Sequence, residues 1–197
     1  MPHRVDAVTT TKSAVTRGAI MEAARNIFAR KGYHGTSVTD ITEGLHVRRA
    51  NFYYYFRDKE QLFIELGTET YREVLAVIDA FDVMSDRPVL EEVRRWVDAY
   101  FEYLDRNGAF VARALGDSPE DPEFRATVAR VHKKSARRLG TYVGARSAAG
   151  FNSHVALGMS LMAMLERSWL LLNTADVGMT SESAANSSAE ILTQLMR

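Results

Sequence analysis

The chain has 197 residues, no cysteine, and 25 basic against 25 acidic side chains. This length is enough to bury a substantial core without a disulfide or a structural metal. The lack of cysteine excludes disulfides, thiolate zinc sites and cysteine nucleophiles, so the cytoplasm is the expected compartment.

The net charge of zero conceals an uneven distribution along the chain. Residues 1–59 hold ten Lys or Arg against five Asp or Glu, which leaves 15 basic and 20 acidic residues in 60–197. A basic front on an acidic remainder suits a protein that meets an anionic polymer at one end, although many solvated surfaces share this balance.

Residues 1–15 lack the continuous apolar stretch of a secretory signal and are expected to form a flexible arm. From Thr16 to Lys31, apolar residues recur at intervals of three and four, which predicts a helix with one buried face. Gly32 can then adopt the left-handed conformation that ends such a helix.

Two short helices should follow. The first is expected over 37–45 with Thr36 as its cap, and only His46 and Val47 separate it from a segment over 48–56. That segment is rich in aromatic residues and has high strand propensity, but its setting after a tight turn predicts a helix. Two helices joined in this way are typical of a helix-turn-helix, whose second helix enters the major groove of DNA.

Helical spacing of apolar residues continues to the C-terminal end, and no strand is predicted. The expected helices cover 58–79, 88–107, 109–115, 121–146, 152–173 and 181–196, with Asn107-Gly108 as a stop between the second and third. The apolar run 155–172 approaches the length of a membrane span, but Glu166 and Arg167 interrupt it and favour a buried helix of a soluble protein. The sequence therefore predicts an all-α fold of about nine helices.

Residues 16–65 resemble the DNA-binding signature of the TetR family of transcriptional regulators. The matching residues are Gly32-Tyr33, Thr36-Ser37-Val38, Asp40-Ile41, Val47 through the aromatic run 52–56, and Asp58-Lys59-Glu60-Gln61-Leu62. Several residue types at fixed offsets make this pattern more specific than a short motif. The resemblance implies a flexible arm over 1–15, a helix-turn-helix DNA-binding domain over 16–61, and a helical effector-binding and dimerisation domain over 62–197.

The residues expected to contact DNA lie on the helix-turn-helix and at the start of the next helix. They are Thr36, Arg48, Arg49, Asn51, Tyr53, Tyr55 and Lys59. Arginine can fork onto guanine and asparagine onto adenine, although any of these side chains could hold a phosphate instead. For Thr36, simple helix capping is an equally good interpretation, and Phe52 and Phe56 are expected to pack in the core.

Two positions depart from the family pattern. His46 stands where the family has glycine in the turn, and Arg48 stands where a serine or threonine caps the third helix. Histidine tolerates a left-handed backbone moderately well, and the missing hydroxyl cap costs about 1 kcal/mol. The fold is expected to persist at both positions.

The resemblance also implies an effector pocket among the middle helices and a dimer built from the last two. The candidate ligand-binding residues are Trp96, Tyr100, Tyr103, Phe110, Arg113, His132, Met159, Met162 and Trp169, each of which could instead be ordinary structure. The candidate dimer interface is a seam at helical spacing: Ala184, Ser188, Ile191 and Leu195.

Together these features predict a homodimeric repressor that binds a palindromic double-stranded DNA operator and is released by a small-molecule effector, with no cofactor and no bound metal. An enzyme is disfavoured because the chain lacks a phosphate loop, a Gly-x-Ser-x-Gly elbow and a His-Glu-x-x-His pair. A helical adaptor whose aromatic segment binds protein is the other alternative, and the sequence leaves the sign of regulation open.

Overall fold

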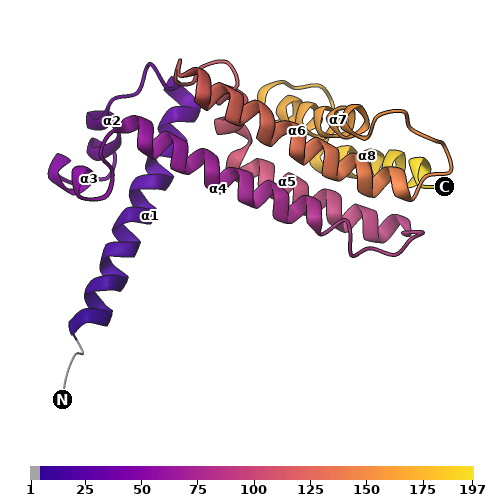
Figure 1. The fold of residues 1–197 in the computed structure, drawn as a ribbon, viewed down its shortest axis with the longest axis horizontal. Coiled ribbons are helices and arrows are strands. Elements are labelled where there is room, and N and C mark those ends of the chain that lie inside the picture. The colour runs from indigo at the N-terminus through magenta and orange to yellow at the C-terminus, as the bar shows by residue number, and fades with distance from the viewer. Residues whose placement is uncertain (1–4) are drawn as a thin grey trace. The chain divides into compact units, whose positions relative to one another are not determined.

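The computed structural model describes the backbone of residues 5–197 and the side chains from Val15 onward (Figure 1). Within this range the chain is all-α, as predicted, with eight helices. They are α1 Val5–Lys31, α2 Val38–Glu43, α3 Arg49–Tyr55, α4 Lys59–Asp79, α5 Leu90–Ala114, α6 Pro122–Ala145, α7 His154–Thr174 and α8 Ser181–Leu195. The aromatic segment after the tight turn is a helix, as its setting predicted.

The first helix begins earlier than the sequence pattern predicted. α1 starts at Val5, whereas apolar periodicity placed its beginning at Thr16. Residues 5–15 contain neither glycine nor proline, so nothing in their sequence stops the helix from extending toward the N-terminus. Residues 1–4 of the predicted arm lie outside the described residues.

Side-chain caps start the later helices at or next to the first residue of each predicted range. The Asp58 carboxylate accepts a hydrogen bond from the backbone N–H of Gln61 at 2.8 Å, before α4. Asp121 caps α6, and Pro122 occupies its first turn. Ser153 accepts from the N–H of Ala156 at the start of α7. Each bond satisfies a donor that a helix start leaves free.

The predicted break at Asn107-Gly108 was wrong, and this explains why the described residues form eight helices and not nine. α5 passes through both residues and ends at Ala114. Asn107 is fully buried, and its side-chain amide donates to the Glu73 carboxylate at 2.8 Å. A Cβ at Gly108 would lie 2.6 Å from the Trp169 ring, so glycine here allows close packing without ending the helix. Tertiary contacts outweigh the low helix propensity of both residues.

The chain forms two compact units. The first runs to Glu69 and includes Phe110–Pro119, and the second comprises Thr70–Ala109 and Glu120–Arg197. α4 and α5 each contribute residues to both units. The segment Phe110–Pro119, which the family resemblance assigned to the C-terminal domain, thus belongs to the same unit as the helix-turn-helix.

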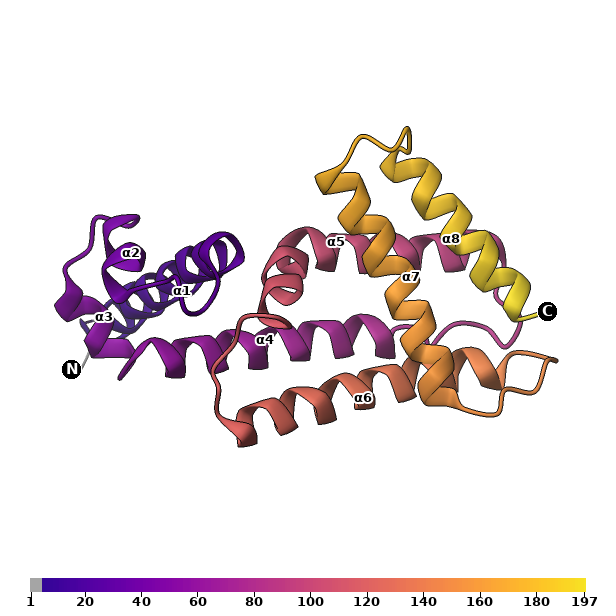
Figure 2. The same ribbon diagram turned by 90° about the horizontal axis from the view of Figure 1, so that it is seen from above.

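The second unit is a helical bundle in which α7 packs closely against α6, with α8 beside α7 (Figure 2). Two glycines lie at the contact between α6 and α7. A Cβ at Gly158 would lie 1.8 Å from the carbonyl oxygen of Ala136, and a Cβ at Gly140 would lie 1.8 Å from that of His154. The two backbones can therefore approach this closely only because neither residue has a side chain.

α7 has the length and composition of a membrane-spanning helix, with a mean hydropathy of 1.4. Its inner face packs in the bundle, where Leu161, Met162, Leu165 and Trp169 are buried. The expectation of a buried helix therefore holds for one face of α7 only, because 28% of its most apolar window is buried.

The contact between α6 and α7 makes a stability prediction. Gly158→Ala should lower the free energy of unfolding by about 1–3 kcal/mol, because the methyl group collides with the Ala136 backbone. Gly67→Ala in α4 is the matched control: a Cβ there meets no atom within 4 Å, so the variant should be stabilised by about 0.5–1 kcal/mol. Urea unfolding followed by circular dichroism measures both, and equal effects would contradict the close backbone approach.

Candidate nucleic-acid interface

The junction between α1 and α2 is held by a capping box, but not by the predicted residue. Ser37, and not Thr36, is the N-cap of α2: its hydroxyl accepts from the N–H of Asp40, and the Asp40 carboxylate accepts from the N–H of Ser37 at 2.8 Å. The Thr36 hydroxyl donates to the Gly32 carbonyl at 2.6 Å, and the residue is only 3% exposed. The cap prediction was therefore displaced by one residue, and the Thr36 hydroxyl points inward.

Lys59 occupies the first turn of α4, with its ammonium group directed back to the same junction. Its Nζ donates to the carbonyl oxygens of Tyr33 and Thr36 at 2.7 and 2.9 Å and lies 4.3 Å from the centre of the Tyr33 ring. Desolvation lowers the pKa of this amine from its ordinary value. These contacts hold the backbone that leads into α2, a structural role of Lys59 that the sequence did not predict.

The turn between α2 and α3 contains both departures from the family pattern. His46 has a φ of +52°. Among the described residues, no other residue except glycine has a positive φ. Arg48 is the N-cap of α3, and its side chain makes no capping hydrogen bond. Histidine thus takes the left-handed position in place of glycine, and α3 begins without the hydroxyl cap.

α3 has one buried face and one exposed face. Phe52 and Phe56 are 0% and 1% exposed, and their rings pack 5.7 Å apart, which confirms their predicted place in the core. Around this buried face, Arg48, Arg49, Asn51 and Tyr53 are exposed, and Tyr55 is half-buried. These exposed side chains include donors and aromatic rings of the kind that read DNA.

Tyr54 is a candidate that the sequence analysis did not single out. It is the most exposed of the three tyrosines of α3, at 78%, and its ring makes an edge-on contact with that of Tyr55 at 4.8 Å. The helical register reveals it, since Phe52 and Phe56 fix the inner face and residue 54 lies half a turn away from both.

The core of the first unit depends on the distant segment Phe110–Pro119. The Phe110 ring lies 5.3 Å from that of Phe63 and 6.4 Å from that of Phe28. The carboxylate of Asp117 accepts from the backbone N–H of His34 at 3.2 Å and lies 3.5 Å from the Arg113 guanidinium. Phe110 and Arg113 therefore contact residues of the first unit, whereas the sequence analysis proposed them as lining of an effector pocket.

The remaining candidate ligand residues lie in the second unit but are mostly core. Trp96 donates from its indole to the Val77 carbonyl at 2.7 Å, and the Tyr100 hydroxyl donates to Glu166 at 3.4 Å. Burial raises the pKa of that glutamate. The others that pack as core or partly buried side chains are Tyr103, His132, Met159 and Met162. Of the nine candidates only Trp169 lines the described pocket of the second unit, which has a volume of about 490 Å³.

The predicted dimer seam mixes two faces of α8. Ala184 and Ser188 are 4% and 3% exposed and pack inside their own bundle, so they leave little surface for a second copy to contact. Ile191 is 47% exposed, and Leu195 is partly buried against the core. Small residues at helical spacing indicate a close helix contact, whether with a second copy or within one chain. For Ala184 and Ser188 the contact is within the chain.

The comparisons with known proteins agree with this architecture. Residues 20–66 match the model of the family described as bacterial regulatory proteins, tetR family. The chain is 25% identical over 138 residues to the HTH-type transcriptional regulator YdgC of Bacillus subtilis, covering 67% of this chain and 71% of YdgC. It is 33% identical over 98 residues to the HTH-type transcriptional repressor AcnR of Corynebacterium diphtheriae, covering 48% of this chain and 52% of AcnR. The chain thus spans about half the length of that repressor.

Solved structures show the same fold at low identity. The TetR family transcriptional regulator PfmR from Thermus thermophilus superimposes with a TM-score of 0.69 at 21% identity, covering 90% of this chain and 98% of PfmR. A transcriptional regulator from Saccharomonospora viridis, solved in complex with choline, gives a TM-score of 0.67 at 17% identity over 92% of this chain and 95% of its own.

The uncapped start of α3 predicts a stabilising substitution. Arg48→Ser places a hydroxyl at the N-cap and should raise the free energy of unfolding by about 1 kcal/mol. Arg49→Ser, one residue inside the helix, cannot cap it and should give no such gain. Chemical denaturation of both variants tests this, and a loss of stability in Arg48→Ser would contradict the expectation.

The capping box of α2 predicts an acid dependence. The Lys31 ammonium first, and Ser37 next, hold the pKa of the Asp40 carboxyl well below its usual range. A depressed carboxyl pKa means that its contribution to stability is complete above about pH 4 and is lost as the pH falls toward the folded-state pKa. Asp40→Asn should therefore lose stability at pH 7 and show a shallower fall on acidification.

The measurement is thermal unfolding followed by circular dichroism between pH 7 and pH 2.5. Glu43→Gln is the matched control, because it lies on the same helix and forms no ion pair within the described side chains. A profile for Asp40→Asn parallel to that of the unmodified chain would show that the carboxylate contributes nothing.

Proposed function

Because the chain belongs to the TetR family of bacterial regulatory proteins, we propose that it is a cytoplasmic repressor that binds DNA as a homodimer and releases it when a small molecule binds. The observation that carries DNA binding is the exposed surface of α3, where arginine, asparagine and tyrosine side chains reach solvent on a helix anchored by two buried phenylalanines. The family is one of transcriptional regulators and not of enzymes.

The exposed side chains of α3 suit the major groove. In this proposal Arg49 and Asn51 meet base edges, and Tyr53 and Tyr54 donate to phosphates or contact thymine methyl groups. Arg48 and Arg49 form no ion pair within the described side chains, so their charge is available to DNA. Lys59 and Thr36 act indirectly, since they fix the chain that leads into α2.

The dimer is proposed to form through the outward sides of α7 and α8. Only 28% of the most apolar window of α7 is buried in a single copy, which leaves apolar surface for a second copy to cover. Ile191, on the outward side of α8, extends this surface. A two-fold axis would bring two α3 helices to successive major grooves about 34 Å apart, and this spacing requires a nearly palindromic operator.

The proposed release depends on the helices that the two units share. α4 and α5 are each continuous from one unit into the other. A ligand that prefers one position of these helices would change the spacing of the two DNA-reading helices and so lower operator affinity. The ligand must therefore bind the free protein more tightly than the operator complex.

The test is selection of duplex DNA from a random pool by the purified chain, followed by titration of the enriched site at several salt concentrations. The expected result is a palindrome whose affinity falls steeply with salt, because lysine and arginine displace counterions from phosphates. Absence of enrichment, together with capture of a protein by the aromatic surface, would replace the proposal with an adaptor function.

A substitution on α3 should separate DNA reading from folding. Arg49→Ala is expected to weaken the enriched site by about 1–3 kcal/mol, the usual cost of losing one base contact, with an unchanged unfolding temperature. Arg95→Ala is the matched control: Arg95 is also exposed but lies on the part of α5 that belongs to the second unit. Equal effects of the two variants would remove Arg49 from the interface.

A further inference from the structure

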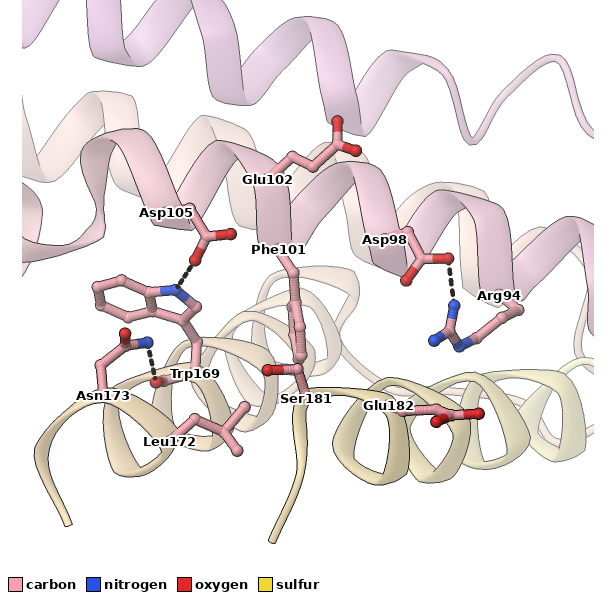
Figure 3. A pocket seen from close by; sticks show the side chains of 10 residues that line it. All are labelled: Arg94, Asp98, Phe101, Glu102, Asp105, Trp169, Leu172, Asn173, Ser181 and Glu182. Carbon is pink, nitrogen blue, oxygen red and sulfur yellow. Dashed lines mark hydrogen bonds and ion pairs between the residues drawn. The ribbon is translucent and has the colours of Figure 1, made fainter. Parts of the chain in front are cut away.

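A pocket of about 490 Å³ lies within the second unit, between α5, the last turns of α7 and the start of α8 (Figure 3). Asp105 and Trp169 meet at one end of it, Arg94 and Asp98 at the other, and Phe101 extends between them. Its volume falls in the range of small-molecule sites.

The lining of this pocket is strongly acidic. Asp98, Glu102, Asp105 and Glu182 contribute four carboxylates against one guanidinium, that of Arg94, which is already paired with Asp98. Glu102 and Glu182 form no ion pair within the described side chains. Four negative groups and one positive group leave a negative potential that attracts a cation and repels an anion.

The same pocket has an aromatic wall that is held in place. Phe101 and Trp169 are each 7% exposed. The indole N–H of Trp169 donates to the Asp105 carboxylate at 2.7 Å, and the missing side chain of Gly108 makes room for its ring. Aromatic rings beside carboxylates stabilise an organic cation by cation–π attraction as well as by charge.

The spacing of the carboxylates argues against a metal ion as the occupant. Within the described residues, no group of three or more histidine, aspartate or glutamate side chains gathers closely enough to hold a metal. The negative charge is instead spread around a mostly polar cavity, whose apolar lining is Phe101, Trp169 and Leu172. Such a site fits a charge carried on a bulky organic group.

We propose that this pocket binds an organic cation: a quaternary ammonium or protonated amine attached to an apolar body. Five of the lining residues lie on α5, which continues to Ala114 in the first unit. An occupant would therefore contact a helix that also reaches the DNA-binding unit. That the cation acts as the effector rests on the proposed function, but its binding does not.

The binding test uses Trp169 as its own reporter. The chain has two tryptophans, so Trp96→Phe leaves Trp169 as the only one. Titration of this variant with benzyltrimethylammonium chloride should give a saturable change in tryptophan emission. Benzyl alcohol, a neutral molecule with the same ring, should bind at least about ten-fold more weakly, because the charge supplies much of the attraction.

Charge-removing variants locate the binding site. Asp105→Asn keeps an oxygen that accepts from the Trp169 indole but removes the charge, and Glu182→Gln removes a second charge. Each should weaken binding of benzyltrimethylammonium by about three- to ten-fold. Glu190→Gln is the matched control, because Glu190 is exposed on α8 and does not line the pocket. Unchanged affinity in both pocket variants, or equal binding of benzyl alcohol, would overturn the proposal.

A second copy of the chain seated over the pocket is the competing occupant. It would make the apparent affinity for benzyltrimethylammonium fall as protein concentration rises, and that result would also overturn the proposal. The DNA measurements stay separate: saturable cation binding without an enriched DNA site would refute the proposed function alone. An enriched site with no cation binding would refute the pocket alone.

Discussion

The burial of Phe110 beside Phe28 and Phe63 is the contact on which the DNA-binding unit depends. A helix-turn-helix of about fifty residues has little core of its own, and folded units of this size are marginally stable. Here the end of α5 supplies an additional aromatic ring, and Asp117 binds the turn after α1 through the backbone of His34. The unit that presents α3 is therefore completed by residues more than forty positions farther along the chain.

Within that unit, the polar residues divide between holding the backbone and facing solvent. Lys59, Thr36 and the Ser37-Asp40 pair use their hydrogen bonds to fix the approach to α2. The exposed polar groups of α3 take no part in these contacts, so they lie on a rigidly supported helix and are available to a partner. A rigid support matters because base reading depends on donors held in a defined register.

Local features were predictable from the sequence, and features set by distant contacts were not. The caps of α4, α6 and α7, the buried faces of Phe52 and Phe56, and the left-handed His46 follow from residues only a few positions apart. The continuity of α5 through Asn107-Gly108 depends on Glu73 and Trp169, which no local pattern reveals. The same holds for Phe110 and Arg113: bulky or charged side chains in a helical body fit a pocket as well as a contact with a distant helix. Small residues such as Ala184 and Ser188 likewise do not indicate which neighbour they approach.

The discontinuous make-up of the first unit has a consequence for exchanging parts between regulators. A chimera joined once, at the boundary within α4, would carry α1 to α3 from one parent and residues 110–119 from the other. Gly32 would then face a foreign residue in place of Asp117, at a position where even a Cβ of its own would lie 1.7 Å from that carboxylate. Transplanting the DNA specificity of this protein therefore requires the exchange of two segments. The DNA-binding unit is compact in space but is built from two separate stretches of the sequence.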